Sequence, residues 1–161
     1  MAAGLSMATL IYFNDSSAGS GLELLNDFLF HGRSSDTYIV LSRFFGTIIS
    51  YLSGAAGGIF SPSLAIGGSI GGLIAKLFGS SDQNILVLLG MIGFLTGVTK
   101  TPFTSFILVV EMTNKHSAIF PMMVTALVAL LASNIIHNQS FYERMKHVYL
   151  EQIAQSDHLR A

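Results

Sequence analysis

Most of the chain consists of apolar segments of unequal length, separated by short polar or glycine-rich breaks. The segments cover, in chain order, residues 22–30, 37–53, 62–79, 85–99, 103–112 and 118–136. A helix that crosses the hydrocarbon core of a bilayer needs about 20 apolar residues. Residues 118–136 approach this length, whereas residues 85–99 and 103–112 are well short of it. Short apolar segments interrupted by glycine and proline indicate broken or re-entrant membrane helices.

The composition favours a membrane protein over a soluble one. Hydrophobic residues make up 51% of the 161 residues and charged residues only 11%, against about 25% charged in an average soluble domain. The mean hydropathy is +0.61. The alternative, buried core helices of a soluble protein, leaves too few polar faces to cover such a domain. The length suits one domain or part of one. The net charge of −1 implies no attraction to nucleic acid. The lack of cysteine excludes disulfides and thiolate chemistry.

The glycine-rich stretch that ends at a proline carries the clearest chemical signal. Pro62 fixes φ and has no N–H. Proline therefore fits the first turn of a helix and is disfavoured deeper inside one. The residues just before it would then present free backbone N–H groups at the positive end of the helix dipole: Gly58, Ile59, Phe60 and Ser61. Such a helix start attracts an anion without a basic side chain. Inside a membrane, we expect it to be a substrate site.

Several glycines lie four residues apart, on one face of a helix. The pairs are Gly54/Gly58, Gly67/Gly71, Gly68/Gly72 and Gly93/Gly97. Small residues at this spacing let helix backbones approach closely in lipid, so we interpret most of the pairs as packing positions. Only the Gly57-Gly58 dipeptide, next to Ile59, favours a functional role, because it lets the backbone come close to a ligand.

Ionisable side chains within the apolar segments are expected to face protein or water. Arg43, Lys100 and Glu111 are costly at membrane depth unless they do so, and Lys76 can extend its amine to the membrane surface from the end of its segment. Glu111 is a candidate for proton handling, but it lies next to a polar break, and ion pairing or helix termination is the favoured interpretation.

Other chemistries find little support. Residues 67–71 match the G-x-S-x-G nucleophile pattern, but Ser69 would lie inside a helix with no strand before it, which contradicts the turn that a hydrolase requires. The histidines show no paired metal-ligand spacing, and no dinucleotide or P-loop pattern is present. We therefore predict no enzyme, no catalytic residue, no metal and no cofactor.

Tyr142 could donate its hydroxyl to an anion if its segment folds back into the protein, although an interfacial tyrosine is more often a membrane anchor.

Taken together, the motifs resemble the CLC family of chloride channels and chloride–proton antiporters. Gly58-Ile59-Phe60-Ser61-Pro62 is similar to the family's G-x-F-x-P anion motif, and residues 98–113 (VTKTPFTSFILVVEMT) are similar to a later family segment. Phe120-Pro121 and Phe141-Tyr142 keep the family's order and spacing. The resemblance covers the chain from about residue 19 onward.

The resemblance implies an all-α membrane protein, the second inverted-repeat half of the CLC transport domain, with short, broken and tilted helices. Residues 1–13 would be the tail of a preceding helix, residues 19–136 the helical membrane region, and residues 137–161 the tyrosine segment and polar C-terminus. Chloride would bind the backbone amides of Ile59 and Phe60 and the hydroxyl of Tyr142, within a site made of Gly58, Ile59, Phe60, Ser61, Pro62 and Tyr142. Residues 101–112 and 118–136 would contribute to a homodimer interface.

The implied function is voltage-gated chloride channel or chloride–proton antiporter activity, with chloride as bound substrate and protons as a second ion. The family's first-half serine and gating-glutamate motifs do not occur in this chain, so we expect a missing N-terminal half as partner, and channel versus antiporter stays open. Multi-pass insertion in a bilayer, with the plasma or inner membrane favoured, follows from the resemblance. Basic residues after the last segment favour a cytoplasmic C-terminus: Arg144, Lys146 and Arg160. The alternatives are a truncated, non-transporting membrane interaction module and, more distantly, a serine hydrolase using Ser69.

Overall fold

The computed structural model describes residues 19, 21–30, 35–53, 58–80, 82–136, 145, 146 and 150. These residues form α-helices and one 3-10 turn, and the part of the chain that is described contains no strand, which confirms the predicted all-α class. The helices begin and end within about one turn of the predicted limits. They are α2 (Leu22–Phe30), α3 (Thr37–Leu52), α4 (Phe60–Phe78), α5 (Gln83–Thr99), α6 (Pro102–Thr113), the 3-10 turn η2 (His116–Ala118) and α7 (Ile119–Ile136).

Three consecutive helices end at a residue in the left-handed conformation. These residues are Gly79 after α4 (φ 58°), Lys100 after α5 (φ 58°) and Asn114 after α6 (φ 52°). Glycine adopts this conformation without penalty, whereas a side chain such as that of Lys100 costs about 1 kcal/mol or more. The N–H of Lys100 closes the last turn of α5 on the carbonyl of Thr96 at 2.8 Å, and Pro102 then occupies the first turn of α6. The connection between α5 and α6 is therefore a short reversal.

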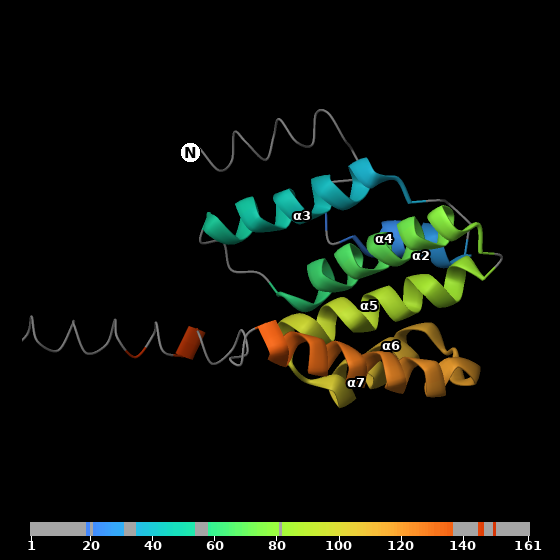
Figure 1. The fold of residues 1–161 in the computed structure, drawn as a ribbon. Helices are drawn as coiled ribbons and strands as arrows, with labels where there is room; N and C mark the ends of the chain where they lie inside the picture. Colours follow the sequence, from blue (N-terminus) through green and yellow to red (C-terminus); the bar gives the residue numbers. More distant parts are fainter. Residues whose placement is uncertain are drawn as a thin grey trace, which may run out of the picture.

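The helices form successive layers, which Figure 1 shows from top to bottom. α3 lies on one side, α4 and the short α2 come next, α5 follows, and α6 and α7 lie on the other side. The most extensive contact joins α4 to α5. This pair forms the centre of the structure, with α2 and α3 against α4 and with α6 and α7 against α5.

Glycines allow α4 and α5 to pack with their backbones in contact. A methyl group added to Gly67 would overlap the carbonyl oxygen of Gly90, and one added to Gly71 would overlap that of Leu86. The contact runs both ways, since a methyl group on Gly90 would meet the carbonyl oxygen of Gly67. The predicted packing role of Gly67 and Gly71 is confirmed. Gly90 belongs to none of the predicted pairs and is as tightly enclosed as they are.

The pairs Gly68/Gly72 and Gly93/Gly97 have different outcomes, whereas Gly54 and Gly57 lie outside the described residues. A methyl group on Gly68 would overlap the side chain of Leu25, so this face of α4 receives α2. On α5, the nearest atom to a methyl group on Gly93 would be Cγ2 of Thr125 at 3.7 Å, and nothing lies within 4 Å at Gly97. An added methyl group at Gly93 or Gly97 would thus meet no backbone, so this pair is not among those that bring two helix backbones into contact in the described residues.

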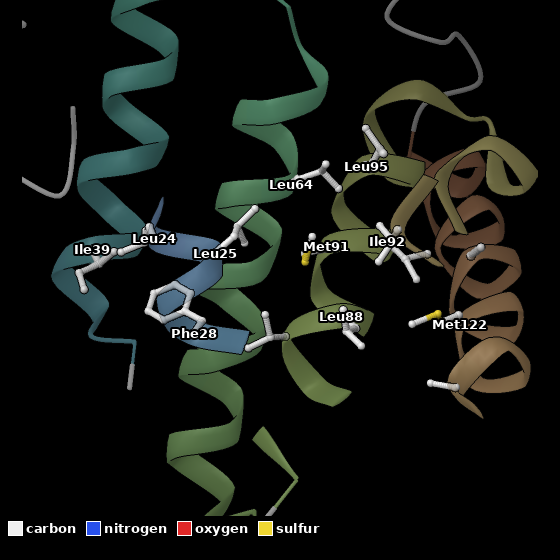
Figure 2. Packing of buried hydrophobic residues seen from close by; sticks show 14 residues of the cluster. Leu24, Leu25, Phe28, Ile39, Leu64, Leu88, Met91, Ile92, Leu95 and Met122 are labelled. Atoms are coloured by element: carbon white, nitrogen blue, oxygen red, sulfur yellow. The ribbon is translucent and has the colours of Figure 1, made fainter. Parts of the chain in front are cut away.

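The hydrophobic core extends across all of these layers. Figure 2 shows α2 inserting Leu24, Leu25 and Phe28 beside α4, while Met91 and Ile92 of α5 lie farther along toward α7. The remaining buried members are Ile39, Leu64, Val87, Leu88, Leu95, Val109, Ala118, Met122 and Ala126. This continuous core fixes the start of α4 relative to α5.

Candidate functional site

The candidate site is the N-terminal turn of α4. Phe60 is its first residue, Ile59 precedes it as the N-cap (φ −87°, ψ −20°), and Pro62 lies in the first turn, as the sequence predicts. The N–H of Ser63 donates to the carbonyl of Ile59 at 3.1 Å. Helix geometry leaves the N–H groups of Ile59 and Phe60 without an acceptor inside the helix, and the N-cap residue Ile59 makes no side-chain capping bond. The amides of Ile59 and Phe60 therefore lie at the positive end of a 19-residue helix.

The side chains around this turn leave it accessible. Gly58 is exposed, and an added methyl group there would meet nothing within 4 Å. Ile59, Ser61 and Pro62 are half-buried, and Phe60 is 36% exposed. From Ser63 to Ser69 every residue of α4 is buried, and the helix becomes exposed again at its far end. The helix start is thus accessible and leads directly into the buried middle of α4.

The antiparallel register shows which part of α5 lies beside this turn. Gly67 faces Gly90 and Gly71 faces Leu86, so each step back along α4 corresponds to an equal step forward along α5. Extending this register places Phe60 level with Gly97, near the end of α5. Figure 1 shows the start of α4, the end of α5 and the end of α7 at the same side of the molecule.

Tyr142, the predicted side-chain donor, lies outside the described residues. Met145, which follows it closely in sequence, is described, and its Sδ lies 2.9 Å from the hydroxyl oxygen of Tyr51 at the end of α3. α3 is antiparallel to α4, since Asp36 at its start pairs with Lys76 near the end of α4. Met145 is therefore held at the end of the helix layers where α4 begins.

The ionisable residues of the apolar segments all have protein partners or lie at the surface. Arg43 is 7% exposed and donates from Nη1 to the carbonyl of Gly19 at 3.1 Å. Lys100 donates from Nζ to Oδ1 of Asn134 at 2.9 Å. Glu111 is exposed on α6. The prediction that Arg43 faces protein is confirmed, and the proton-handling interpretation of Glu111 stays untested.

Ser69 lacks the geometry of a hydrolase nucleophile. It lies in the middle of α4, is fully buried, and donates its hydroxyl to the carbonyl of Ala65 at 2.7 Å. A nucleophile elbow requires the serine on an exposed turn between a strand and a helix. The G-x-S-x-G match is therefore a packing feature of a glycine-rich helix. Among the residues with a described structure, no three histidines, aspartates or glutamates gather as metal ligands.

Among the residues that the structure describes, two helices are long and apolar enough to cross a membrane. They span Phe60–Phe78, with a mean hydropathy of 1.2, and His116–Ile136, with a mean hydropathy of 2.2. Three shorter apolar helices accompany them: Thr37–Leu52, Gln83–Thr99 and Pro102–Thr113. The described residues thus form an all-α fold whose apolar helices suit a membrane protein.

Comparison with known proteins gives the family. The sequence model of the family described as "Voltage gated chloride channel" matches residues 1–134. The H(+)/Cl(-) exchange transporter ClcA of Vibrio cholerae (strain M66-2) is 30% identical over 146 residues, which cover 86% of this chain and 31% of that protein. ClcA of Klebsiella pneumoniae is 35% identical over 111 residues, covering 65% of this chain and 24% of that protein. The chain belongs to the voltage-gated chloride channel family, and it spans about a quarter to a third of the length of these relatives.

Proposed function

We propose that this chain supplies the second half of a transmembrane anion pathway, and that chloride binds at the start of α4. The observation that carries the proposal is the position of the Ile59 and Phe60 amides, before the first hydrogen bond of a helix whose residues from Ser63 to Ser69 are buried. The relatives are named as exchangers of protons and chloride. Protons are therefore the second ion that we propose for the whole transporter.

Physical chemistry favours an anion at this position. Hydrogen bonds between backbone N–H groups and a charged acceptor are shorter and stronger than those between neutral groups. The helix dipole adds positive potential at the same end, and the low dielectric constant of the surroundings strengthens both effects. A chloride ion can thus be held without a cationic side chain, which would bind it too tightly for rapid transport.

We propose Tyr142 as the side-chain donor to the same ion. Its near neighbour in sequence, Met145, contacts Tyr51 at the end of the molecule where α4 begins. A phenol hydroxyl donates one hydrogen bond and carries no charge at neutral pH. It would complete a site made otherwise of backbone amides.

The remaining partners follow from the length of the relatives and the exposed apolar helices. We propose that an N-terminal half, corresponding to the rest of the relatives' length, completes the pathway, and that the assembly is a homodimer in contact through α6 and α7. Both helices expose large apolar side chains, among them Phe103, Ile107, Leu127 and Leu131. The plasma membrane, or the inner membrane of a bacterium, is the location that we propose.

The test removes one backbone donor and compares it with a matched control. Ile59→Pro deletes the N–H at a position where φ is already −87° and glycine precedes it, whereas Ile59→Ala deletes only the side chain. A hydrogen bond to a charged group contributes about 1.5–3 kcal/mol, so we expect Ile59→Pro to weaken chloride binding by about tenfold or more. Calorimetric titration would use protein purified from its native membrane through a tag on this chain, so that associated chains are retained.

Flux in liposomes then separates the functional alternatives. A chloride gradient that drives protons uphill identifies an antiporter, and chloride flux without proton movement identifies a channel. The absence of both chloride flux and chloride binding favours the non-transporting interaction module. Equal chloride affinity in Ile59→Pro and Ile59→Ala would remove the start of α4 as the binding site.

A further inference from the structure

Two side-chain hydrogen bonds join the end of α7 to the end of α5. The hydroxyl of Ser133 donates to the carbonyl oxygen of Gly97 at 2.8 Å. The next residue, Asn134, accepts at Oδ1 from Nζ of Lys100 at 2.9 Å. Because these contacts come from consecutive residues of α7, they fix both the height and the rotation of its last turn relative to α5.

These bonds contrast with the rest of the α7 surface. Met122 and Ala126, in the first half of α7, are buried against the core, whereas Ile135 and Ile136 at its end are each 86% exposed. Apolar packing therefore holds the first half of α7, and polar contacts hold the last turn. Between membrane helices, hydrogen bonds of this kind act as modest local attachments.

The joined ends lie beside the start of α4. The register of α4 against α5 places Gly97 level with Phe60. The Ser133 hydroxyl thus attaches α7 to the carbonyl on α5 that is nearest in height to the candidate anion site. Lys100 supports the same turn, because its left-handed conformation ends α5 one residue after Thr99.

We propose that Ser133 and Asn134, together with Lys100 and the carbonyl of Gly97, form a polar latch that positions the chain leaving α7 relative to the start of α4. The latch residues are positioning residues and do not touch the anion. Their effect is on chloride affinity, because they fix the point from which the chain continues toward Tyr142. This inference rests on the proposed function and adds to it the residues that set the geometry of the site.

The experiment measures chloride affinity by calorimetry in the same tagged assembly. Ser133→Ala removes the interhelical donor, and Ser133→Thr keeps it. Thr125→Val is the matched control, because Thr125 donates within α7 to the carbonyl of Pro121 at 2.9 Å and joins no second helix. We expect Ser133→Ala to weaken chloride binding by about three- to tenfold, the range given by one interhelical hydrogen bond. Ser133→Thr and Thr125→Val should stay within about twofold of the unchanged protein.

A second pair of variants guards against a general loss of folding. Asn134→Leu removes the acceptor for Lys100, while Asn134→Asp keeps an acceptor oxygen and should retain affinity. Combining Ser133→Ala with Tyr142→Phe should give less than the product of the two single effects, because both act on one donor.

The outcomes distinguish the latch from the proposed site. If Ser133→Ala and Asn134→Leu bind chloride normally while Ile59→Pro and Tyr142→Phe do not, the latch is wrong and the site stands. If Thr125→Val weakens binding as much as Ser133→Ala, the effect is general to α7 and the latch is also wrong. If Ile59→Pro and Tyr142→Phe both bind chloride normally, the site is wrong and the latch falls with it.

Discussion

The two longest helices, α4 and α7, are opposite in character. α4 has the lower mean hydropathy, 1.2, and 56% of its most apolar window is buried, whereas the span that contains α7 has a mean hydropathy of 2.2 and only 11% of the corresponding window is buried. In a water-soluble protein the more apolar helix is expected in the core. The reversal indicates that the surroundings of α7 are apolar, as lipid or another membrane helix would be.

Small and polar residues explain why α4 can be central. Its interior face carries Gly67 and Gly71, which let the α5 backbone approach, and its buried serine, Ser69, satisfies its hydroxyl on the helix's own backbone. Packing between membrane helices depends on such close approach, because burial of apolar groups from lipid gives no advantage. α4 is thus stabilised by close packing of its backbone against α5. α7 is stabilised because its exposed apolar surface lies in apolar surroundings.

The largest expected effect is at the α4–α5 contact. Gly90→Leu would drive a side chain into the carbonyl of Gly67 and the backbone of Gly71, neither of which can move without separating the helices. Overpacking typically costs about 1–3 kcal/mol, and this case falls at the upper end because the obstructing atoms are backbone. We expect little folded protein in detergent, measured as the monodisperse fraction in size-exclusion chromatography.

The control for this change lies one turn farther along α5. Gly93→Ala meets only Cγ2 of Thr125, at 3.7 Å, and replacing glycine by alanine favours helix formation by up to about 1 kcal/mol. It should leave the folded fraction unchanged or raise it. Normal folding of Gly90→Leu would show that α4 and α5 do not pack backbone to backbone.

The sequence predicted the helices better than it predicted their contacts. Pro62, Gly79 and Pro102 act locally, through fixed φ, left-handed conformation and a missing N–H, so the helix limits could be predicted from them. Which helix lies against a glycine depends on the tertiary arrangement. For that reason Gly90 was missed, and the four-residue spacing alone could not separate Gly67/Gly71, where an added methyl group would meet backbone, from Gly93/Gly97, where it would not.

The candidate site shows the same division. The helix start at Ile59 and Phe60 follows from local rules and is present in the structure, whereas its chloride role rests on the family resemblance. The bonds from Ser133 to Gly97 and from Lys100 to Asn134 join residues more than 30 positions apart. No periodicity or motif contains such contacts, so only the folded arrangement could supply them.

The second prediction tests the surroundings of α7. Val128 lies near the middle of this helix and is 59% exposed. Val128→Arg should reduce membrane insertion, because a charged residue at the centre of a membrane helix costs about 2.5–3.5 kcal/mol. The inserted fraction can be measured by alkaline extraction of membranes, with Val128→Leu as control. Equal insertion of the arginine and leucine variants would mean that this face of α7 meets water.

The third prediction concerns the buried arginine on the other side of α4. Arg43→Ala removes the hydrogen bond to the carbonyl of Gly19, and a buried bond from a charged donor contributes about 1.5–3 kcal/mol. We expect a lower melting temperature in detergent. Thr47→Val, which removes only a bond to the carbonyl of Arg43 within α3 at 2.8 Å, should cost less.

Gly21→Ala should have an effect similar to that of Arg43→Ala. Gly21 has a φ of +84°, and an added methyl group would lie 2.5 Å from Cβ of Ala65 and 3.0 Å from Nη1 of Arg43. Because both changes disturb one contact, the double variant should lose less than the sum of the single losses. Strict additivity would show that Arg43 does not hold the turn before α2.

The smallest expected effect is at the far end of α4, where Lys76 pairs with Asp36 at the start of α3. The side chains are 51% and 61% exposed, and exposed pairs contribute only about 0.2–1 kcal/mol. Asp36→Asn should therefore lower the melting temperature slightly, and the double variant Asp36→Lys with Lys76→Asp should recover it. Potassium gluconate would raise the ionic strength without changing chloride, and at about 1 M it should abolish the difference, because the screening length falls to about 3 Å. A loss that persists in high salt would place this pair away from water, and the end of α4 would then be enclosed like its middle.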